Sequence, residues 1–525
     1  MTDTPIWRAA GLMTVGTALS RLTGLVRIAA MTYALGITGT RLADTYNLAN
    51  TTPNIVYELF LGGILTSVFV PVLIETRERN ERDASALISI SLIALAVISA
   101  IAAIGAPFIM RIYTFRVPDP VARAQQLELA TYLLRWFAPQ IFFYGLSAVA
   151  EALLNVRGRF APPKFAPVLN NLVVAATLLG YAHLFGQQTL TLSGGAKVLL
   201  GAGTTAGVVL QAFVLLPYLR GERLRPIFDL RDPAVARVLR LSVYVIGYVV
   251  INQLGLWVVL ALANGVRGGV TSWQVAFIFF QLPHGLFAVS LQTAIFPDIS
   301  RAAAAADWDM FRRRFASGVR GVVFLLAPAA IGYAVLAHPI TRLVLARGVA
   351  DVSDAAAVAR ILQVFASGLV FYSLFHLLTR CFYALPDTRT PTAINAVAVA
   401  VNVAVAFPLF FRFGVRGLAA GHAIAYAIGV VLLSSVLTRR IPGGLGLSSL
   451  APSMLRIVGI ASAMGACVAL ISGALHATDL VEVGVSVGAG AILYLAFSQV
   501  AGVEERMILL GFLRGRRRAE RKGNA

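Results

Sequence analysis

Two arginines lie inside the first long apolar stretch of this chain, where inserting a charged side chain into a membrane costs about 2.5–3.5 kcal/mol. Arg21 and Arg27 are six residues apart and therefore project from different faces of a helix. One interpretation is structural, with each guanidinium paired to helix-end carbonyl groups or to a nearby acid. The other is a cationic lining for an anionic ligand, because guanidinium groups bind phosphate oxygens bidentately.

Other polar side chains flank this stretch and the next one. Ser20 precedes Arg21, and Asp44 lies at the start of the second stretch, where a structural and a binding role are both open. Asn54 follows Pro53, and a helix turn broken by that proline would expose backbone groups to a cavity. Further candidates for a polar cavity are Glu58, Asn252, Gln253 and Gln281. For the three uncharged candidates, hydrogen bonding between helices is the favoured role.

Motifs for catalysis are absent from the sequence. It contains no GxxxxGK[ST] phosphate loop, so we expect no ATP hydrolysis. Its two cysteines have no CxxC spacing, and His284, His338, His376 and His422 are spread along the chain without ligand spacing. We expect each of these histidines to be packed or interfacial. The prediction is a protein that is not an enzyme and that holds no metal and no cofactor.

The composition is typical of a membrane protein. Apolar residues make up 58% of the 525 residues and charged residues 13%, whereas soluble domains have about half and a quarter. Apolar stretches bounded by charge, Gly or Pro predict fourteen spans. They cover residues 10–34, 46–74, 84–110, 128–153, 161–183, 195–218, 236–264, 270–299, 315–337, 355–385, 390–411, 415–438, 453–474 and 479–500. We therefore expect an all-α polytopic fold.

The positive charges indicate how the chain is oriented. The net charge of +20 does not predict nucleic-acid binding, because the cations fall in short loops between apolar stretches. Counted with the adjoining span ends, the loops after even-numbered spans and the C-terminal tail hold 29 Lys and Arg, against 10 for the loops after odd-numbered spans. Since cytoplasmic loops carry the excess, we predict a protein of the cytoplasmic membrane with both termini in the cytoplasm. The basic tail lies against the anionic inner leaflet or is a disordered solubilising end.

Prolines predict an internal repeat. Pro53 and Pro283 are 230 residues apart, and Pro163 and Pro391 are 228 apart. This offset covers six spans, an even number, so both halves would enter the membrane in the same direction. The predicted organisation is two pseudo-symmetric six-helix lobes, at 1–220 and 221–440, then two extra spans at 441–503 and the tail at 504–525.

An ordered set of motifs runs through the chain. They are SRLTGLVR at 20–27, AD at 43–44 with PN at 53–54, FVP at 69–71, GRF at 158–160 with FAPVL at 165–169, PHG at 283–285, and FYA at 382–384 with DTRTP at 387–391. Together they resemble the MurJ (MviN) family of lipid II flippases, which belongs to the multidrug/oligosaccharidyl-lipid/polysaccharide exporter superfamily.

The resemblance implies a fourteen-span carrier with a central cationic cavity. It would take lipid II, an undecaprenyl-pyrophosphate-linked disaccharide-pentapeptide, from the inner to the outer leaflet by alternating access for cell wall synthesis. Ser20, Arg21, Arg27, Asp44 and Asn54 would then bind the substrate. Beyond lipid II and the bilayer, proteins of cell-wall synthesis or division would be its partners.

The chain departs from the family pattern at positions that usually carry charge. Ile28, Tyr57, Gly62 and Ile278 stand where many members have an acid or an arginine, so the coupling ion is open. Three alternative functions also remain: a flippase for another polyprenyl-pyrophosphate-linked glycan, a drug/cation antiporter of the same superfamily, and a membrane scaffold for wall-synthesis enzymes.

Overall fold

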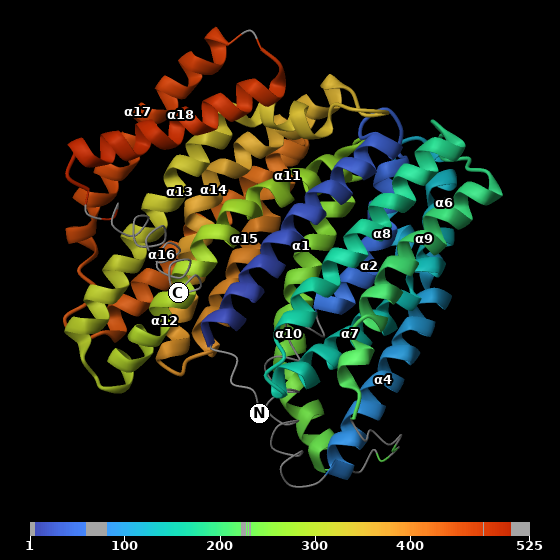
Figure 1. Ribbon diagram of the computed structural model, residues 1–525, viewed down its shortest axis with the longest axis horizontal. Helices are drawn as coiled ribbons and strands as arrows, with labels where there is room; N and C mark the ends of the chain where they lie inside the picture. Colours follow the sequence, from blue (N-terminus) through green and yellow to red (C-terminus); the bar gives the residue numbers. More distant parts are fainter. Residues whose placement is uncertain are drawn as a thin grey trace, which may run out of the picture. The chain divides into compact units, whose positions relative to one another are not determined.

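The structure is a computed structural model that describes residues 6–58, 81–221, 227, 229, 233–475, 477–503 and 505. In these residues the chain forms helices and no strand (Figure 1). The α-helices are α1 (Ile6–Leu35), α2 (Leu42–Glu58), α4 (Glu81–Ile104), α5 (Ala106–Thr114), α6 (Pro120–Phe137), α7 (Pro139–Val156), α8 (Ala161–Phe185), α9 (Gly194–Phe213), α10 (Pro233–Ala263), α11 (Gly269–Pro283), α12 (Val289–Ala304), α13 (Trp308–Leu345), α14 (Val352–Ala384), α15 (Arg389–Phe413), α16 (Val415–Arg440), α17 (Leu447–Ala474) and α18 (Asp479–Val500). The short elements are a 3₁₀-helix, η2 (Leu216–Leu219), and a π-helix, η3 (His284–Ala288).

The predicted spans are confirmed as helices. Within the described residues, eleven helical segments are long and apolar enough to cross a membrane. They coincide with eleven of the fourteen predicted stretches, and the other three, at 10–34, 46–74 and 236–264, coincide with α1, α2 and α10. The second half of the 46–74 stretch, with Gly62 and the motif at 69–71, lies outside the described residues, as does almost all of the basic tail.

One span is divided by a proline. The boundary between α6 and α7 lies at Ala138 and Pro139, because proline has no N–H to bond to the preceding turn. Side chains of neighbouring helices bond to carbonyl groups at this break. Ser99 Oγ donates to Ala138 O over 2.8 Å, and Thr205 Oγ1 donates to Trp136 O over 2.7 Å. A break inside a span is tolerated when neighbours bond to the freed backbone in this way.

The predicted repeat is visible in the backbone. α8 and α15 each have 25 residues and begin 228 positions apart. Both helices end at a glycine with positive φ, and the two glycines have similar backbone angles. Gly186 has φ 63° and ψ −153°, and Gly414 has φ 59° and ψ −143°. The turn before each helix also matches, because Arg159 N donates to Leu154 O as Asp387 N donates to Phe382 O.

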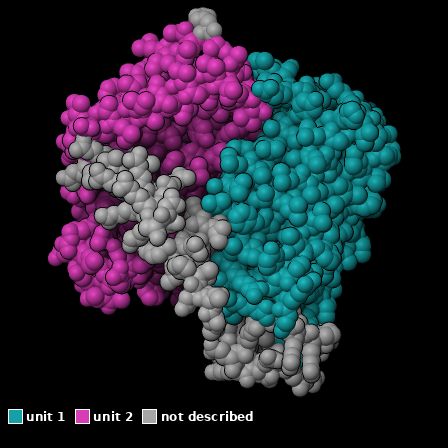
Figure 2. Space-filling model, in the orientation of Figure 1, with its two compact units in different colours: residues 1–271, 345–354 teal, residues 272–344, 355–525 magenta. Residues whose placement is uncertain are grey.

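The chain divides into two compact units (Figure 2). Unit 1 consists of residues 1–271 and 345–354, and unit 2 of residues 272–344 and 355–525. In unit 1, α1 packs along α8, α8 packs along α9, and α2 packs against α6 and α7; in unit 2, α15 packs along α16, and α17 packs against α18. Unit 1 therefore includes residues 221–271, with the whole of α10, and residues 345–354 from the second predicted lobe. The lobe boundaries at 220 and 440 stay predictions.

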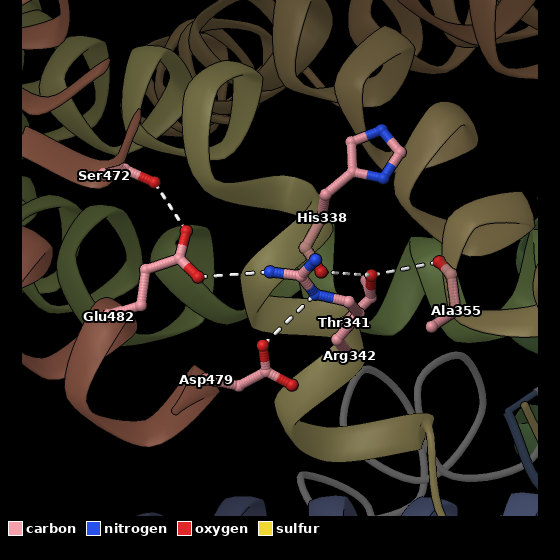
Figure 3. A network of polar contacts seen from close by, with 7 residues as sticks. All are labelled: His338, Thr341, Arg342, Ala355, Ser472, Asp479 and Glu482. Atoms are coloured by element: carbon pink, nitrogen blue, oxygen red, sulfur yellow. Dashed lines mark hydrogen bonds and ion pairs between the residues drawn. The ribbon is translucent and has the colours of Figure 1, made fainter. Parts of the chain in front are cut away.

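An ion-pair network joins the last two helices to α13 (Figure 3). Arg342 on α13 points between two acids of α18, with Nη2 3.1 Å from Glu482 Oε2 and Nε 3.2 Å from Asp479 Oδ1. Ser472 on α17 donates to Glu482 Oε1 over 2.6 Å. The Glu482 side chain is only 11% exposed, so its charge depends on these partners rather than on solvent.

We expect Arg342→Ala to destabilise the packing of α17 and α18 on α13. The substitution leaves the nearly buried Glu482 carboxylate without its cation, at a cost of about 1–3 kcal/mol. Thermal unfolding of the purified protein should show a lower midpoint. Arg456→Ala, which removes an exposed arginine from α17, is the matched control. Equal midpoints for the two variants would contradict the role assigned to Arg342.

Candidate functional site

α1 presents one face of small and polar residues to α8. Asn171 Nδ2 on α8 donates to Ser20 O over 3.1 Å and to Thr23 Oγ1 over 3.2 Å. Gly24 follows on the same face, where an added Cβ would lie 3.8 Å from Asn171 Nδ2. The predicted site residue Ser20 therefore meets α8 through its backbone carbonyl, and this contact fixes the rotation of α1 about its axis.

The two predicted arginines of α1 have different surroundings. Arg21 is exposed, whereas Arg27 is half-buried. Arg27 hydrogen-bonds to the phenol of the fully buried Tyr46 on α2 and lies near the hydroxyl of Tyr144 on α7. The Tyr46 hydroxyl is also 2.9 Å from Thr204 Oγ1 on α9. Arg27 thus points into the helical interior of unit 1, where it lies beside tyrosine hydroxyl groups.

The remaining polar candidates lie on the three helices α2, α10 and α11. Asn54 is half-buried directly after Pro53 in α2, and the side chain of Glu58, the last residue of α2, lies outside the described residues. Asn252 and Gln253 are half-buried on α10. Gln281 is half-buried on α11, in unit 2. Their assignment to a substrate cavity stays a prediction.

Asp44 is fully buried and caps the start of α11. Its carboxylate accepts hydrogen bonds of 2.8 Å from Gly268 N, Thr271 N and Thr271 Oγ1. A helix N-terminus has unbonded N–H groups and a partial positive charge, so a carboxylate is a favourable partner there. Gly268 has φ 71°, and an added Cβ would lie 2.5 Å from Ile37 O. The two loops therefore meet backbone to backbone, which only glycine permits at this position.

A second carboxylate, Asp354, bonds to the loop between α1 and α2. It accepts from Ile37 N over 3.1 Å, from Thr38 N over 2.7 Å, and from the Thr38 hydroxyl. Beside it, Asp351 caps α14, and hydrogen bonds from the Ser353 hydroxyl and the Asp354 N–H hold the pKa of the Asp351 carboxyl below its usual range. The sequence analysis missed Asp354, because acids in the first turn of a helix are usually ordinary caps.

Asn264 makes the matching contact from the loop between α10 and α11. Its Oδ1 accepts from Gln126 Nε2 on α6 over 3.0 Å, and its Nδ2 donates to Tyr113 O on α5 over 3.1 Å. Arg41 Nη1 donates to Asn264 O over 2.8 Å. The α1–α2 loop therefore bonds to α14, while the α10–α11 loop bonds to α6. The two loops occupy equivalent places in the two repeats, and so do α6 and the start of α14. The loop of each repeat therefore bonds to the equivalent helix of the other repeat.

We call the bonds made by Asp44, Asp354 and Asn264 the loop network. It connects the segments that follow α1, α5, α10 and α13, which are all loops after odd-numbered predicted spans. All of its residues belong to unit 1. The loop network thus holds these helix ends together. Its bonds are made by polar groups, so water can replace the lost hydrogen bonds when the contacts separate.

Comparison with known proteins identifies the family. Residues 31–485 match the family model described as lipid II flippase MurJ. The chain belongs to the lipid II flippase MurJ family. A lipid II flippase MurJ from Burkholderia cenocepacia is 30% identical over 448 residues, which cover 82% of this chain and 83% of that protein. A probable lipid II flippase MurJ from Haemophilus influenzae is 29% identical, over 79% and 83% of the two chains.

Solved structures share the fold. A lipid II flippase MurJ in an inward closed conformation superposes with a TM-score of 0.78 at 21% identity, covering 93% of this chain and 98% of that chain. An inward-facing multidrug resistance MATE family transporter of the MOP superfamily superposes with a TM-score of 0.67 at 15% identity, covering 83% and 99%. The resemblance drawn from the MurJ motifs is confirmed, and the chain is a multi-pass membrane protein of a transporter family.

We expect Asp44→Ala to loosen the loop network. Loss of a buried, charged acceptor leaves the Gly268 and Thr271 amides unbonded, at a cost of about 2–3 kcal/mol. Amide hydrogen exchange in residues 268–271 should become roughly 30- to 150-fold faster, since about 1.4 kcal/mol corresponds to a factor of ten. Asp309→Ala, which removes a side chain that is 73% exposed, should leave this segment unchanged. Unchanged exchange in Asp44→Ala would show that Asp44 does not hold the loops.

Proposed function

We propose that this protein moves lipid II from the inner to the outer leaflet of the cytoplasmic membrane by alternating access. The observation that carries the proposal is the family match over residues 31–485, together with relatives that are named as lipid II flippases over more than three-quarters of this chain. The chain itself supplies two features that such a carrier needs, a charge-bearing interior and a set of contacts that can close one side.

The loop network supports the alternating-access part of the proposal. By the positive-inside rule both termini would lie in the cytoplasm, and the loops after odd-numbered spans would then face outward. In this orientation Asp44 and Asp354 close the outer end through six hydrogen bonds. At about 0.5–1.5 kcal/mol net for each bond, closure is worth roughly 3–9 kcal/mol. Substrate binding and the membrane potential, at about 2.3 kcal/mol per charge per 100 mV, are of the right size to reverse it.

Arg27 supports the choice of an anionic substrate. We infer that the Arg27 guanidinium, which lies beside the Tyr46 and Tyr144 hydroxyls, binds an oxygen of the lipid diphosphate. Arg21, six residues earlier, is exposed and would contact the substrate from a second face of α1. Ser20, Asn54 and Asp44 complete the proposed lining, with Asp44 acting through the loop network rather than on the phosphates.

The other functions differ from this one in what they need. A carrier for another polyprenyl-pyrophosphate-linked glycan would use the same arginines, so only the transported headgroup distinguishes it. A drug/cation antiporter needs acids that bind cations, whereas Asp44 is already occupied by three donors. We propose that the chain acts as a carrier and not as an enzyme, with proteins of cell-wall synthesis as its partners.

Translocation in proteoliposomes tests the proposal. With an imposed membrane potential, the wild-type protein should move labelled lipid II and should move a lipid-linked O-unit much more slowly. Arg27→Ala should reduce the rate at least tenfold, because it removes a half-buried positive charge, and Arg27→Lys should restore part of the rate. Arg21→Ala should reduce the rate as well.

The controls separate transport from folding. Arg123→Ala removes an exposed arginine at the start of α6 and should keep the wild-type rate. In a flippase-depleted strain, Arg21→Ala and Arg27→Ala should fail to complement although their membrane levels are normal. Absence of lipid II movement by the wild-type protein would refute the proposed function, and full activity of both arginine variants would refute the binding role.

A further inference from the structure

A buried polar network lies beside Arg27 in the interior of unit 1. The Tyr46 hydroxyl on α2, which lies beside the Arg27 guanidinium, is 2.9 Å from Thr204 Oγ1 on α9. Tyr46 and Thr204 are each only 1% exposed. Tyr144 on α7 also lies near Arg27, and its hydroxyl bonds to Asn170 on α8. Arg27 therefore lies next to two hydroxyl groups, and each of them has a second partner on another helix.

Contacts with α6, α8 and α9 hold these two hydroxyl groups in place. The Tyr46 ring packs edge to face on Phe137 of α6, with ring centroids 5.6 Å apart. Asn170 Nδ2 donates to Gln211 Oε1 on α9 over 3.0 Å. At Gly207 of α9 an added Cβ would lie 2.6 Å from Asn170 Oδ1, so α8 and α9 are in close contact there. The hydroxyl groups beside α1 are thus held by contacts that do not involve α1.

A fixed hydroxyl group beside an arginine has a physical use in binding. The arginine side chain has many rotamers, and holding it in one of them costs conformational entropy when a ligand binds. A guanidinium only donates hydrogen bonds, so the Tyr46 oxygen is an acceptor for it. A donor that is already oriented loses less freedom when its ligand arrives. Packing alone does not require the hydroxyls of Tyr46 and Thr204, because phenylalanine and valine would fill similar volumes without a buried polar group.

We propose that Tyr46 is a positioning residue of the carrier, whose hydroxyl group holds the Arg27 guanidinium in the orientation that binds the diphosphate of lipid II. Thr204 fixes this hydroxyl group from α9. Tyr46 acts through Arg27 and does not contact the substrate itself. The inference rests on the proposed function and deepens it, because it names the residues that set the affinity of the Arg27 site.

The Tyr46→Phe variant tests this role, because it removes the hydroxyl group and keeps the ring that packs on Phe137. In proteoliposomes it should raise the KM for lipid II about fivefold to tenfold and change kcat less than twofold, since it removes one hydrogen bond to a charged group. Tyr181→Phe is the matched control, at a fully buried tyrosine of unit 1 on α8, and should keep the wild-type KM. A KM for Tyr46→Phe no higher than that for Tyr181→Phe would overturn the proposal.

Thr204 offers an independent pair of variants. Thr204→Val removes the hydroxyl group that fixes Tyr46 and keeps the side-chain volume, so it should raise the KM about twofold to fivefold. Thr204→Ser keeps the hydroxyl group and should match the wild-type protein. Thermal unfolding checks that both variants are folded. Equal KM values for Thr204→Val and Thr204→Ser would contradict the role given to this hydroxyl group.

A double-mutant cycle tests whether Tyr46 acts through Arg27. Lipid II binding is measured with the purified protein in lipid nanodiscs. In an Arg27→Ala background, Tyr46→Phe should weaken binding less than twofold, because no guanidinium is left to orient. In an Arg21→Ala background it should weaken binding about fivefold to tenfold, as it does in the wild-type protein. A purely structural effect would be the same in both backgrounds, and that result would overturn the proposal.

Side-chain NMR separates this inference from the proposed function. With ¹⁵N-labelled arginine and no lipid II, the Arg27 Nε–H group should be ordered in wild-type protein and in Tyr181→Phe, and clearly more mobile in Tyr46→Phe. Loss of the signal in Arg27→Lys assigns it. Equal order in Tyr46→Phe and wild-type protein would refute the positioning role. If wild-type protein neither binds nor moves lipid II, the proposed function fails, while a loss of order in Tyr46→Phe still shows that Tyr46 orients Arg27.

Discussion

Two buried carboxylates that bond to backbone amides are the constraint on which much of unit 1 depends. Asp44 caps α11, and Asp354 bonds to the loop between α1 and α2. An ionised acid is strongly stabilised by amide donors and strongly destabilised when it is buried without them. The loops therefore have one well-defined bonded arrangement and one solvated arrangement. Intermediate positions, in which a carboxylate is dehydrated but only partly bonded, are unfavourable.

Most of the fold follows from the sequence, because a membrane imposes simple rules on it. The apolar stretches that begin at residues 161 and 389 became helices of equal length, and the proline offset of 228 residues reappeared in their ends and caps. Span length, helix formation and direction of insertion depend on local composition alone. The sequence analysis did not resolve the division of one span at Pro139, although a proline in an apolar stretch is its visible cause.

The site was predictable only in part, because its partners lie far apart in the chain. Charged residues in apolar stretches singled out Arg27 and Asp44, and both have buried or half-buried polar partners. Nothing local marked Asp354, whose partners are more than 300 residues away. The histidines were expected to be packed or interfacial, and His376 and His422 do pack. Their sequence spacing could not show that α14 and α16 bring both around the same two tyrosines.

The reciprocal bonding of the two loops has a consequence for how such a chain arises. In a homodimer of a chain half this length, a contact between a loop of one subunit and a helix of its partner would occur twice by symmetry. The same residues would then have to make both copies of the contact. Fusion of two copies removes that obligation. Here one copy of the contact relies on the carboxyl group of Asp354 and the other on the amides of Gln126 and Asn264. One of the two contacts is therefore made by a titratable carboxyl group, whereas the other is made by amides that do not titrate.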